Sequence, residues 1–307
     1  MASILVLGGT RFFGRRLVQN LIDDGHCVSI GTRGNIRPDF SSEVEYLTLD
    51  RRDPISMANV LKGRRWDVVY DQICMDSIDA SHSVEALGDE VGLYVLTSSL
   101  AVYDLQKKSE TSEQNFDPLS YPLLVKDSAD VGYAEGKRLA EAFLYQRAKF
   151  PVISARFPIV LGEDDYTQRL LKPIVDVLSG HMLRMCADEH EMSLISSAEA
   201  GRFLTRFAKM QETCAMPINA CSIGNISPHR IVELIEAETG RKALVEYVDV
   251  PEGFSLINHQ VTWTMSNQLA SSRGFRFNEL SGWLPQLVES SCRAAISLQR
   301  SPHRVRT

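Results

Sequence analysis

The sequence predicts an α/β fold in which a doubly wound parallel sheet is followed by a smaller C-terminal α/β domain. Short apolar runs, typical of strands buried in a parallel sheet, alternate with helical patterns up to residue 157. This alternation indicates parallel strands joined by right-handed helical crossovers. After Gly162 the alternation fades. We therefore predict a first domain at residues 1–162 and a second at 163–307, with some later segments returning to the first.

The first strand, residues 3–7, leads into a glycine-rich turn and then into a helix that ends at Gly25. This order of strand, turn and helix is the setting of a dinucleotide-binding fingerprint. Gly8 allows a tight turn, Gly9 lets the backbone approach a pyrophosphate, and Gly14 lets the helix pack closely on the strand. The helix N-terminus then faces the phosphates. A glycine turn without a ligand is the alternative. The predicted cofactor-binding turn comprises Gly8, Gly9, Thr10, Arg11, Phe12, Phe13 and Gly14.

The remaining elements follow in order along the chain. Strands are predicted at residues 27–31, 44–49, 67–70, 93–98 and 151–157, and helices at 57–61, 83–87 and 131–148. In the second domain a helix is predicted to begin near residue 164, capped by Asp164 or Asp165. Amphipathic helices at 197–210 and 228–238, a strand at 244–248 and a final helix with Trp283, Leu284 and Leu287 pointing inward come next. The basic tail from residue 300 is predicted to fray.

Tyr133 and Lys137 form the most informative pair of polar residues in the chain. Residues four apart on a helix project from the same face, so their side chains are expected to meet. An ammonium beside a phenol favours the phenolate, which allows the tyrosine to exchange a proton with a substrate hydroxyl or carbonyl. The same spacing is common on solvent-facing helices. Only the neighbouring motifs favour the catalytic interpretation.

Together these motifs resemble the short-chain dehydrogenase/reductase superfamily, in particular its extended branch, the NAD-dependent epimerase/dehydratase family. The resemblance is clear from residue 3 to about residue 162 and looser to about residue 290. It implies a Rossmann-type sheet, a bound NAD or NADP, and a C-terminal domain that binds the substrate. It also implies a homodimer formed through the helix that carries the Tyr/Lys pair.

The resemblance assigns roles to individual residues. Ser99, Tyr133 and Lys137 match the catalytic serine, tyrosine and lysine of the family. In the mechanism that this implies, the tyrosine exchanges the proton, the serine hydrogen-bonds the reacting oxygen, and the lysine also holds the nicotinamide ribose. Ser98 and Thr97 compete with Ser99 for the serine role, although strand alternation lets only one face meet the substrate. Further cofactor contacts are predicted at Asp50 and Arg51, which match the segment bordering the adenine, and at Pro158, in the segment after the sixth strand.

The predicted cofactor site departs from the family pattern in two places. An NAD-preferring site usually carries a carboxylate near the end of the second strand, whereas Thr32 stands there in this chain. Arg33 follows, and its guanidinium can bind the 2′-phosphate of NADP. Arg11 replaces the middle glycine of the usual motif and adds a second cation. We therefore favour NADP over NAD. The alternative is that Arg33 only stacks on the adenine and Arg11 only contacts the pyrophosphate.

The reaction that the resemblance implies is an epimerisation or related redox change of a sugar or nucleotide sugar. Many nucleotide-sugar epimerases carry an asparagine that contacts the diphosphate after the sixth strand, where this chain has Ile159. The segment 70–75 also departs from the family, and its Asp71 and Gln72 are either substrate contacts or a strand end. Leu100 and Ala101 follow the serine, in place of the acidic pair common in dehydratases. Candidate cations for a diphosphate are Arg169, Lys172 and Arg184.

Two other functions stay open. The first is an NADP-dependent reductase of small carbonyl compounds, which keeps the same catalytic residues and changes only the pocket. The second is a nucleotide- or RNA-binding protein of the same fold with little catalysis. The glycine turn together with Thr32, Arg33 and Gly34 also resembles a subgroup that includes chloroplast stem-loop-binding proteins.

The composition is ordinary for an enzyme and disfavours several other classes. The 307 residues include 33 Lys and Arg against 39 Asp and Glu, and the net charge of −6 disfavours a dedicated nucleic-acid binder. No apolar run approaches the roughly 18 residues of a membrane span, and no signal-like segment is visible at the N-terminus. The six cysteines show no metal-binding spacing. We expect a cytoplasmic protein with reduced thiols and no metal site.

Overall fold

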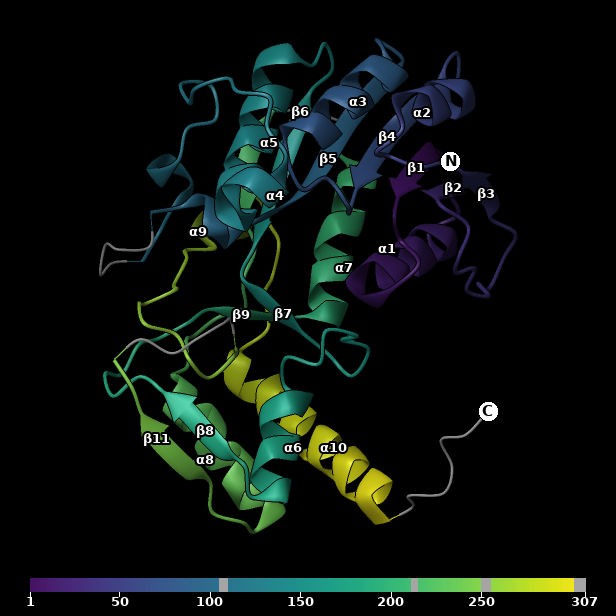
Figure 1. Cartoon of the computed structure of the whole chain (residues 1–307). Coiled ribbons are helices and arrows are strands. Elements are labelled where there is room, and N and C mark those ends of the chain that lie inside the picture. Colours follow the sequence, from purple (N-terminus) through teal and green to yellow (C-terminus); the bar gives the residue numbers. More distant parts are fainter. Residues whose placement is uncertain (105–109, 211–214, 250–254, 301–307) are drawn as a thin grey trace.

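The chain is described by a computed structural model that covers residues 1–104, 110–210, 215–249 and 255–300. Its main body is a sheet of seven strands in the order β10-β6-β5-β4-β1-β2-β3 (Figure 1). All neighbouring pairs in this sheet are parallel, which confirms the predicted α/β class. The strands are β1 (Ser3–Leu7), β2 (Cys27–Thr32), β3 (Glu45–Thr48), β4 (Trp66–Asp71), β5 (Val91–Ser99), β6 (Val152–Phe157) and β10 (Met216–Asn219).

Helices cover both faces of the main sheet because successive strand residues alternate between two cores. One face is covered by α1, α7 and α9, and the other by α2, α3 and α5. Figure 1 shows α1 and α7 beside each other. The bounds are α1 (Phe12–Asp23), α2 (Pro54–Leu61), α3 (Ser77–Leu87), α4 (Ser128–Val131), α5 (Tyr133–Arg147), α7 (Ser197–Thr205) and α9 (Gln268–Ser272).

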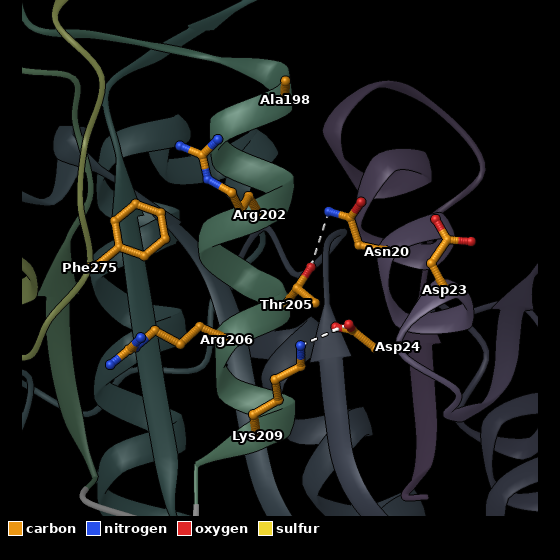
Figure 2. Close-up of a pocket in the computed structure, with 9 residues that line it drawn as sticks. All are labelled: Asn20, Asp23, Asp24, Ala198, Arg202, Thr205, Arg206, Lys209 and Phe275. Atoms are coloured by element: carbon orange, nitrogen blue, oxygen red, sulfur yellow. Dashed lines mark hydrogen bonds and ion pairs between the residues drawn. The ribbon is translucent and has the colours of Figure 1, made fainter.

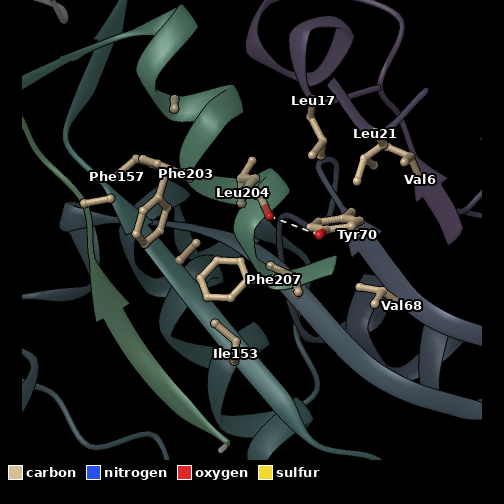
Figure 3. Close-up of a cluster of buried hydrophobic side chains, with 14 of the residues drawn as sticks. Val6, Leu17, Leu21, Val68, Tyr70, Ile153, Phe157, Phe203, Leu204 and Phe207 are labelled. Atoms are coloured by element: carbon tan, nitrogen blue, oxygen red, sulfur yellow. Dashed lines mark hydrogen bonds between the residues drawn. The ribbon is translucent and has the colours of Figure 1, made fainter. Parts of the chain in front are cut away.

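The core between α7 and the sheet joins distant parts of the sequence (Figure 3). Phe203, Leu204 and Phe207 belong to the same buried cluster as Val68 of β4. The hydroxyl of Tyr70, also on β4, donates to the carbonyl of Leu204 at 3.0 Å, and burial raises the pKa of this phenol. Both α7 and β10 therefore belong to the main body, although they follow residue 162 in the sequence. The domain boundary at that residue stays a prediction.

The remaining elements form a smaller part with its own apolar core. It contains two parallel two-stranded sheets, β11-β8 and β7-β9, and the helices α6, α8 and α10 (Figure 1). Short 3₁₀ helices are η1 (Leu100–Val102), η2 (Glu113–Asn115) and η3 (Arg206–Lys209). The other bounds are β7 (Ile159–Leu161), α6 (Leu171–Ser179), β8 (Met182–Met185), β9 (Leu194–Ser196), α8 (Pro228–Thr239), β11 (Leu244–Tyr247) and α10 (Leu280–Arg300).

Two predicted helix starts are wrong, and backbone geometry explains both. The helix predicted over residues 131–148 is interrupted at Gly132, whose φ of 81° is left-handed, so that α5 begins at Tyr133 itself. The helix predicted to begin near residue 164 starts at Leu171, after Gln168 with φ 58°. The Asp165 carboxylate accepts the N–H group of Thr167 at 2.9 Å and so stabilises a turn instead of capping a helix.

Two further expectations concern the ends of the chain and the membrane. The predicted frayed tail begins at Arg300, where α10 ends, and residues 301–307 lie outside the described residues. Among the described helices, none combines the length and the apolar character needed to cross a membrane.

Acidification is expected to destabilise this fold through His259, which is 5% exposed and lies 4.3 Å from the Trp263 ring, centroid to centroid. Burial, with a smaller contribution from His190, lowers the pKa of His259 from 6.5 to about 4. The unfolded chain therefore binds one more proton between these pH values. The stabilisation is complete above pH 6.5 and is lost as the pH falls towards about 4.

Within this window the free energy of unfolding should fall by about 1.4 kcal/mol per pH unit from this residue alone. Urea denaturation at pH 7 and pH 5 measures the fall. In His259→Phe the difference between the two pH values should shrink by the contribution of this histidine. An equal difference in the variant and in the natural protein would contradict the assignment.

Candidate active site

The glycine turn forms an open cradle at the carboxyl end of β1. Gly8 and Gly9 have φ values of 97° and 79°, which only glycine adopts without strain. A Cβ on Gly9 would lie 2.8 Å from the Cγ1 of Val6, and one on Gly14 would lie 3.1 Å from the Cα of Gly9. Turn and helix therefore approach too closely for side chains. The free N–H groups of the first turn of α1 can accept an anion at this point.

The cations predicted to select NADP lie at the rim of the cradle. Arg11 is the N-cap residue of α1, and its side chain is exposed. Thr32 ends β2, and its Oγ1 accepts the N–H group of Gly34 at 3.2 Å. Arg33 is exposed, and among the described residues no hydrogen bond or ion pair engages its guanidinium. This geometry leaves Arg33 available to a phosphate and stays compatible with the alternative of adenine stacking.

Arg51, a predicted cofactor contact, already has partners within the protein. Its side chain is 7% exposed, and its guanidinium donates to the Asp71 carboxylate at 2.6 Å and to the Asp79 carbonyl at 3.0 Å. Burial would raise the pKa of Asp71, but Arg51 and the hydroxyl of Tyr94 hold it below the ordinary value. The guanidinium is thus engaged by the protein itself, and the cofactor contact at Arg51 stays a prediction. Asp50 is half-buried and stays a predicted contact.

Gln72 is a polar residue beside the cradle whose role the sequence left open. A Cβ on Gly8 would lie 3.1 Å from the Cβ of Gln72, and the side-chain nitrogen and oxygen of Gln72 are buried without a partner among the described residues. Buried amides are almost always hydrogen-bonded, so this one fits a polar ligand in the cradle. The closely packed glycines and the unpaired amide together suit a dinucleotide. Asp71, in contrast, forms a buried ion pair with Arg51, which indicates a structural role.

The three hydroxyl residues at the end of β5 have different environments. Ser98 donates to the buried Glu141 carboxylate at 2.5 Å, on the side of the sheet that faces α5. The side chains of Thr97 and Ser99 alternate to the opposite side, and all three residues line a cavity. The Oγ of Ser99 accepts the N–H group of Ala101 at 3.1 Å, which orients the hydroxyl and leaves its proton free to donate. The geometry favours Ser99 over Ser98, and the unpaired hydroxyl of Thr97 makes it a second candidate contact.

The structure brings Tyr133 and Lys137 together as the spacing predicts. The Nζ of Lys137 lies 5.9 Å from the centre of the Tyr133 ring. Lys137 is 3% exposed and donates to the carbonyls of Cys74 at 2.6 Å and Thr97 at 2.9 Å. Because an ammonium has three donors, one remains for the tyrosine or for a ligand. Tyr133 itself is 47% exposed and faces the same cavity as Ser99.

The cavity that these residues share has a volume of about 480 Å³. Its polar lining comes from the end of β5, from Tyr133 and from the loop that carries Thr167 and Arg169, and most of the remaining wall is apolar or aromatic. Several of its members could not be predicted, because they come from loops that no local sequence pattern connects with the site. Its lining includes Phe12, Phe13, Thr97, Leu100, Phe157, Pro158, Ile159, Tyr166, Thr167, Arg169 and Trp263.

A second cavity, of about 560 Å³, lies between α1 and α7 (Figure 2). It shares no lining residue with the first cavity. Lys209 pairs with Asp24 across it at 2.8 Å, and Arg202 pairs with the buried Glu199 at 3.0 Å. Carboxylates thus neutralise both Lys209 and Arg202, and we assign no catalytic role to this cavity.

The cysteines give one unexpected grouping. The ligand atoms of Cys186, Asp188 and His190 lie within 4.8 Å of one another in the loop after β8. Zinc sites commonly combine such donors, usually with a fourth ligand or a water. This surface loop provides three donors within five residues, and we assign no metal to it.

Solved structures with the same fold include a sugar-nucleotide dehydratase and an epimerase. A dTDP-glucose 4,6-dehydratase from Bacillus anthracis superimposes with a TM-score of 0.72 at 15% identity, covering 98% of both chains. The epimerase Mth375 from Methanothermobacter thermautotrophicus gives a TM-score of 0.75 at 18% identity, covering 99% of this chain and 95% of its own. These likenesses show the fold. Residues 4–87 also match the model of the NAD dependent epimerase/dehydratase family.

Over this N-terminal segment the chain is therefore similar to the NAD-dependent epimerase/dehydratase family, and over nearly its whole length it shares the fold of the solved structures. This similarity does not by itself assign a reaction. The chloroplast stem-loop binding protein of 41 kDa b from Arabidopsis thaliana is 34% identical over 114 residues. That match covers 33% of this chain and 30% of the relative, so the relative's whole activity does not transfer.

Proposed function

We propose that this protein is a member of the epimerase/dehydratase family and an NAD(P)-dependent epimerase or related oxidoreductase that acts on a sugar or nucleotide sugar. The observation that carries the proposal is that Ser99 and Tyr133 line one cavity together with Phe12 and Phe13 of the glycine turn, while the buried Lys137 lies beside the Tyr133 ring. The nicotinamide supplies or accepts a hydride when it is bound. Tyr133 exchanges the phenolic proton with the substrate oxygen, Ser99 donates a hydrogen bond to that oxygen, and the ammonium of Lys137 stabilises the phenolate.

Structural neighbours support a nucleotide sugar as the substrate. MoeE5 in complex with UDP-glucuronic acid and NAD superimposes with a TM-score of 0.70 at 20% identity, covering 96% of this chain and 99% of its own. Arg169 lines the cavity and offers a cation for an anionic group. The apolar wall around Ile159 and Trp263 favours a second candidate, the reduction of a small carbonyl compound.

A substrate screen distinguishes these two reactions. The protein is incubated with NADH or NADPH and either nucleotide sugars or small aldehydes and ketones. A reductase consumes reduced cofactor in proportion to product, whereas an epimerase converts one sugar into another with no net change in the cofactor. Binding of neither NAD(H) nor NADP(H) in a fluorescence titration would reject both reactions. Light scattering tests whether the protein forms the homodimer that the family resemblance implies.

The preference for NADP is tested at Arg33. Replacing Arg33 by Ala should weaken NADPH binding about tenfold, because a charge-assisted hydrogen bond to the 2′-phosphate is lost, and should leave NADH binding almost unchanged. Arg65→Ala is the matched control, since this exposed arginine lies at the amino end of β4, whereas Arg33 follows the carboxyl end of β2, and it pairs with Glu90. Equal losses for NADH and NADPH in Arg33→Ala would contradict the proposed preference.

An RNA-binding function remains the candidate from another class. Arg202, Arg206 and Lys209 follow one another along α7 and η3 and line the second cavity (Figure 2). The guanidinium of Arg206 donates to the Arg273 carbonyl at 2.6 Å, which places a fourth basic residue nearby. A titration with a stem-loop RNA at several salt concentrations tests this function. Since we propose an enzyme and not an RNA-binding protein, we expect that any binding of the stem-loop RNA is lost at physiological salt.

A further inference from the structure

Arg11 and Tyr166 meet although 155 positions separate them in the sequence. The Cζ of Arg11 lies 5.1 Å from the centre of the Tyr166 ring, a cation–π geometry. Arg11 belongs to the glycine cradle, and Tyr166 belongs to the loop between β7 and α6. The contact therefore connects the predicted phosphate site with the smaller part of the molecule.

The contact between Arg11 and Tyr166 lies at the surface and not in the hydrophobic core. Tyr166 is 60% exposed, and its ring meets the Phe12 ring edge-on with centroids 6.4 Å apart. The loop behind it is fixed, because Asp164 accepts hydrogen bonds from the Nε of Arg16 at 2.8 Å and from the hydroxyl of Ser197 at 2.7 Å. A half-open aromatic ring on a fixed loop is thus held over the arginine.

The guanidinium of Arg11 keeps its capacity to bind an anion. Stacking on a neutral ring leaves its N–H donors free, and no carboxylate among the described residues pairs with it. It stands at the N-terminus of α1, where free backbone N–H groups also favour negative charge. An arginine held in this way can contact a phosphate without leaving the ring.

The same loop also forms part of the wall of the reaction cavity. Tyr166, Thr167 and Arg169 line it together with Tyr133. We propose that Arg11 and Tyr166 form a clamp over the pyrophosphate of the bound dinucleotide, in which the loop that walls the substrate cavity holds the arginine toward the phosphates. This inference rests on the proposed function. Tyr166 acts in it as a positioning residue.

A double-mutant cycle tests the clamp. Dissociation constants of NADPH and ADP-ribose are measured for the natural protein, Tyr166→Leu, Arg11→Ala and the double variant, after removal of copurified nucleotide. Tyr166→Leu should bind both ligands about fivefold more weakly, and Arg11→Ala at least about tenfold more weakly. The double variant should bind no more weakly than Arg11→Ala alone, because the tyrosine acts through the arginine.

Two controls separate positioning from a structural role. Tyr166→Phe keeps the ring and should bind within about twofold of the natural protein. The melting temperature of ligand-free Tyr166→Leu should stay within about 1 °C, since the side chain is mostly exposed. Unchanged binding by Tyr166→Leu, or losses that multiply in the double variant, would overturn the clamp while leaving the proposed function intact. If the natural protein binds neither ligand, the proposed function fails and the clamp fails with it.

Discussion

Replacing Tyr133 by Phe is expected to lower kcat by about 10²- to 10⁴-fold, the contribution typical of a single acid–base group. The change removes only the phenolic hydroxyl. The ring stays beside Lys137, whose ammonium is held by the carbonyls of Cys74 and Thr97 and not by the tyrosine hydroxyl. Cofactor binding should therefore be retained. Steady-state kinetics with the substrate found in the screen, together with a cofactor titration, measure both quantities.

Tyr121→Phe is the matched control for this experiment. Tyr121 is half-buried, its hydroxyl donates to the Glu135 carboxylate at 2.8 Å, and it does not line the cavity. Its loss should leave kcat within about twofold of the natural value, because no reacting group is touched. Full turnover by Tyr133→Phe would reject this residue as the proton donor and would favour a binding protein of the same fold.

Much of the main sheet could be predicted because its signals are local. β1 is a continuous apolar run, and the glycines after it permit only a narrow set of backbone paths. The strand β10 could not be predicted in the same way. It has four residues and contains Pro217, and its place at the edge beside β6 depends on tertiary packing.

In the candidate site, too, some contacts can be predicted from local sequence spacing and others depend on tertiary packing. Tyr133 and Lys137 are four residues apart, so helix geometry alone predicts that their side chains meet. The buried partner of Arg51 lies 20 positions away at Asp71, and the sequence gives no reason to pair them. Tyr166 enters the cavity from a loop after β7, and its contact with Arg11 follows only from the folded chain.

Replacing Arg156 by Leu is expected to cost about 3–5 kcal/mol of unfolding free energy, because it leaves Glu141 charged, buried and without its ion-pair partner. Both side chains are 0% exposed, and the Nη2 of Arg156 lies 2.5 Å from the Oε2 of Glu141. Burial would lower the pKa of Arg156, but Glu141 and the Tyr103 hydroxyl raise it above its ordinary value, so the arginine stays charged. The guanidinium also donates to the Phe116 carbonyl at 3.2 Å, which ties β6 to the segment before α4. Urea denaturation measures the loss.

The double variant Arg156→Leu with Glu141→Leu separates the buried charge from the loss of packing. Removing both charges should recover most of the loss, because no unpaired carboxylate remains and apolar side chains fill the space. Arg293→Ala is the surface control. It breaks an exposed pair with Glu289 on α10 and should change stability by less than about 1 kcal/mol. A loss of under about 1 kcal/mol in Arg156→Leu as well would show that Glu141 takes up a proton or reaches water when its partner is gone. The pair would then contribute little to the stability of the sheet that positions Ser99 and Tyr133.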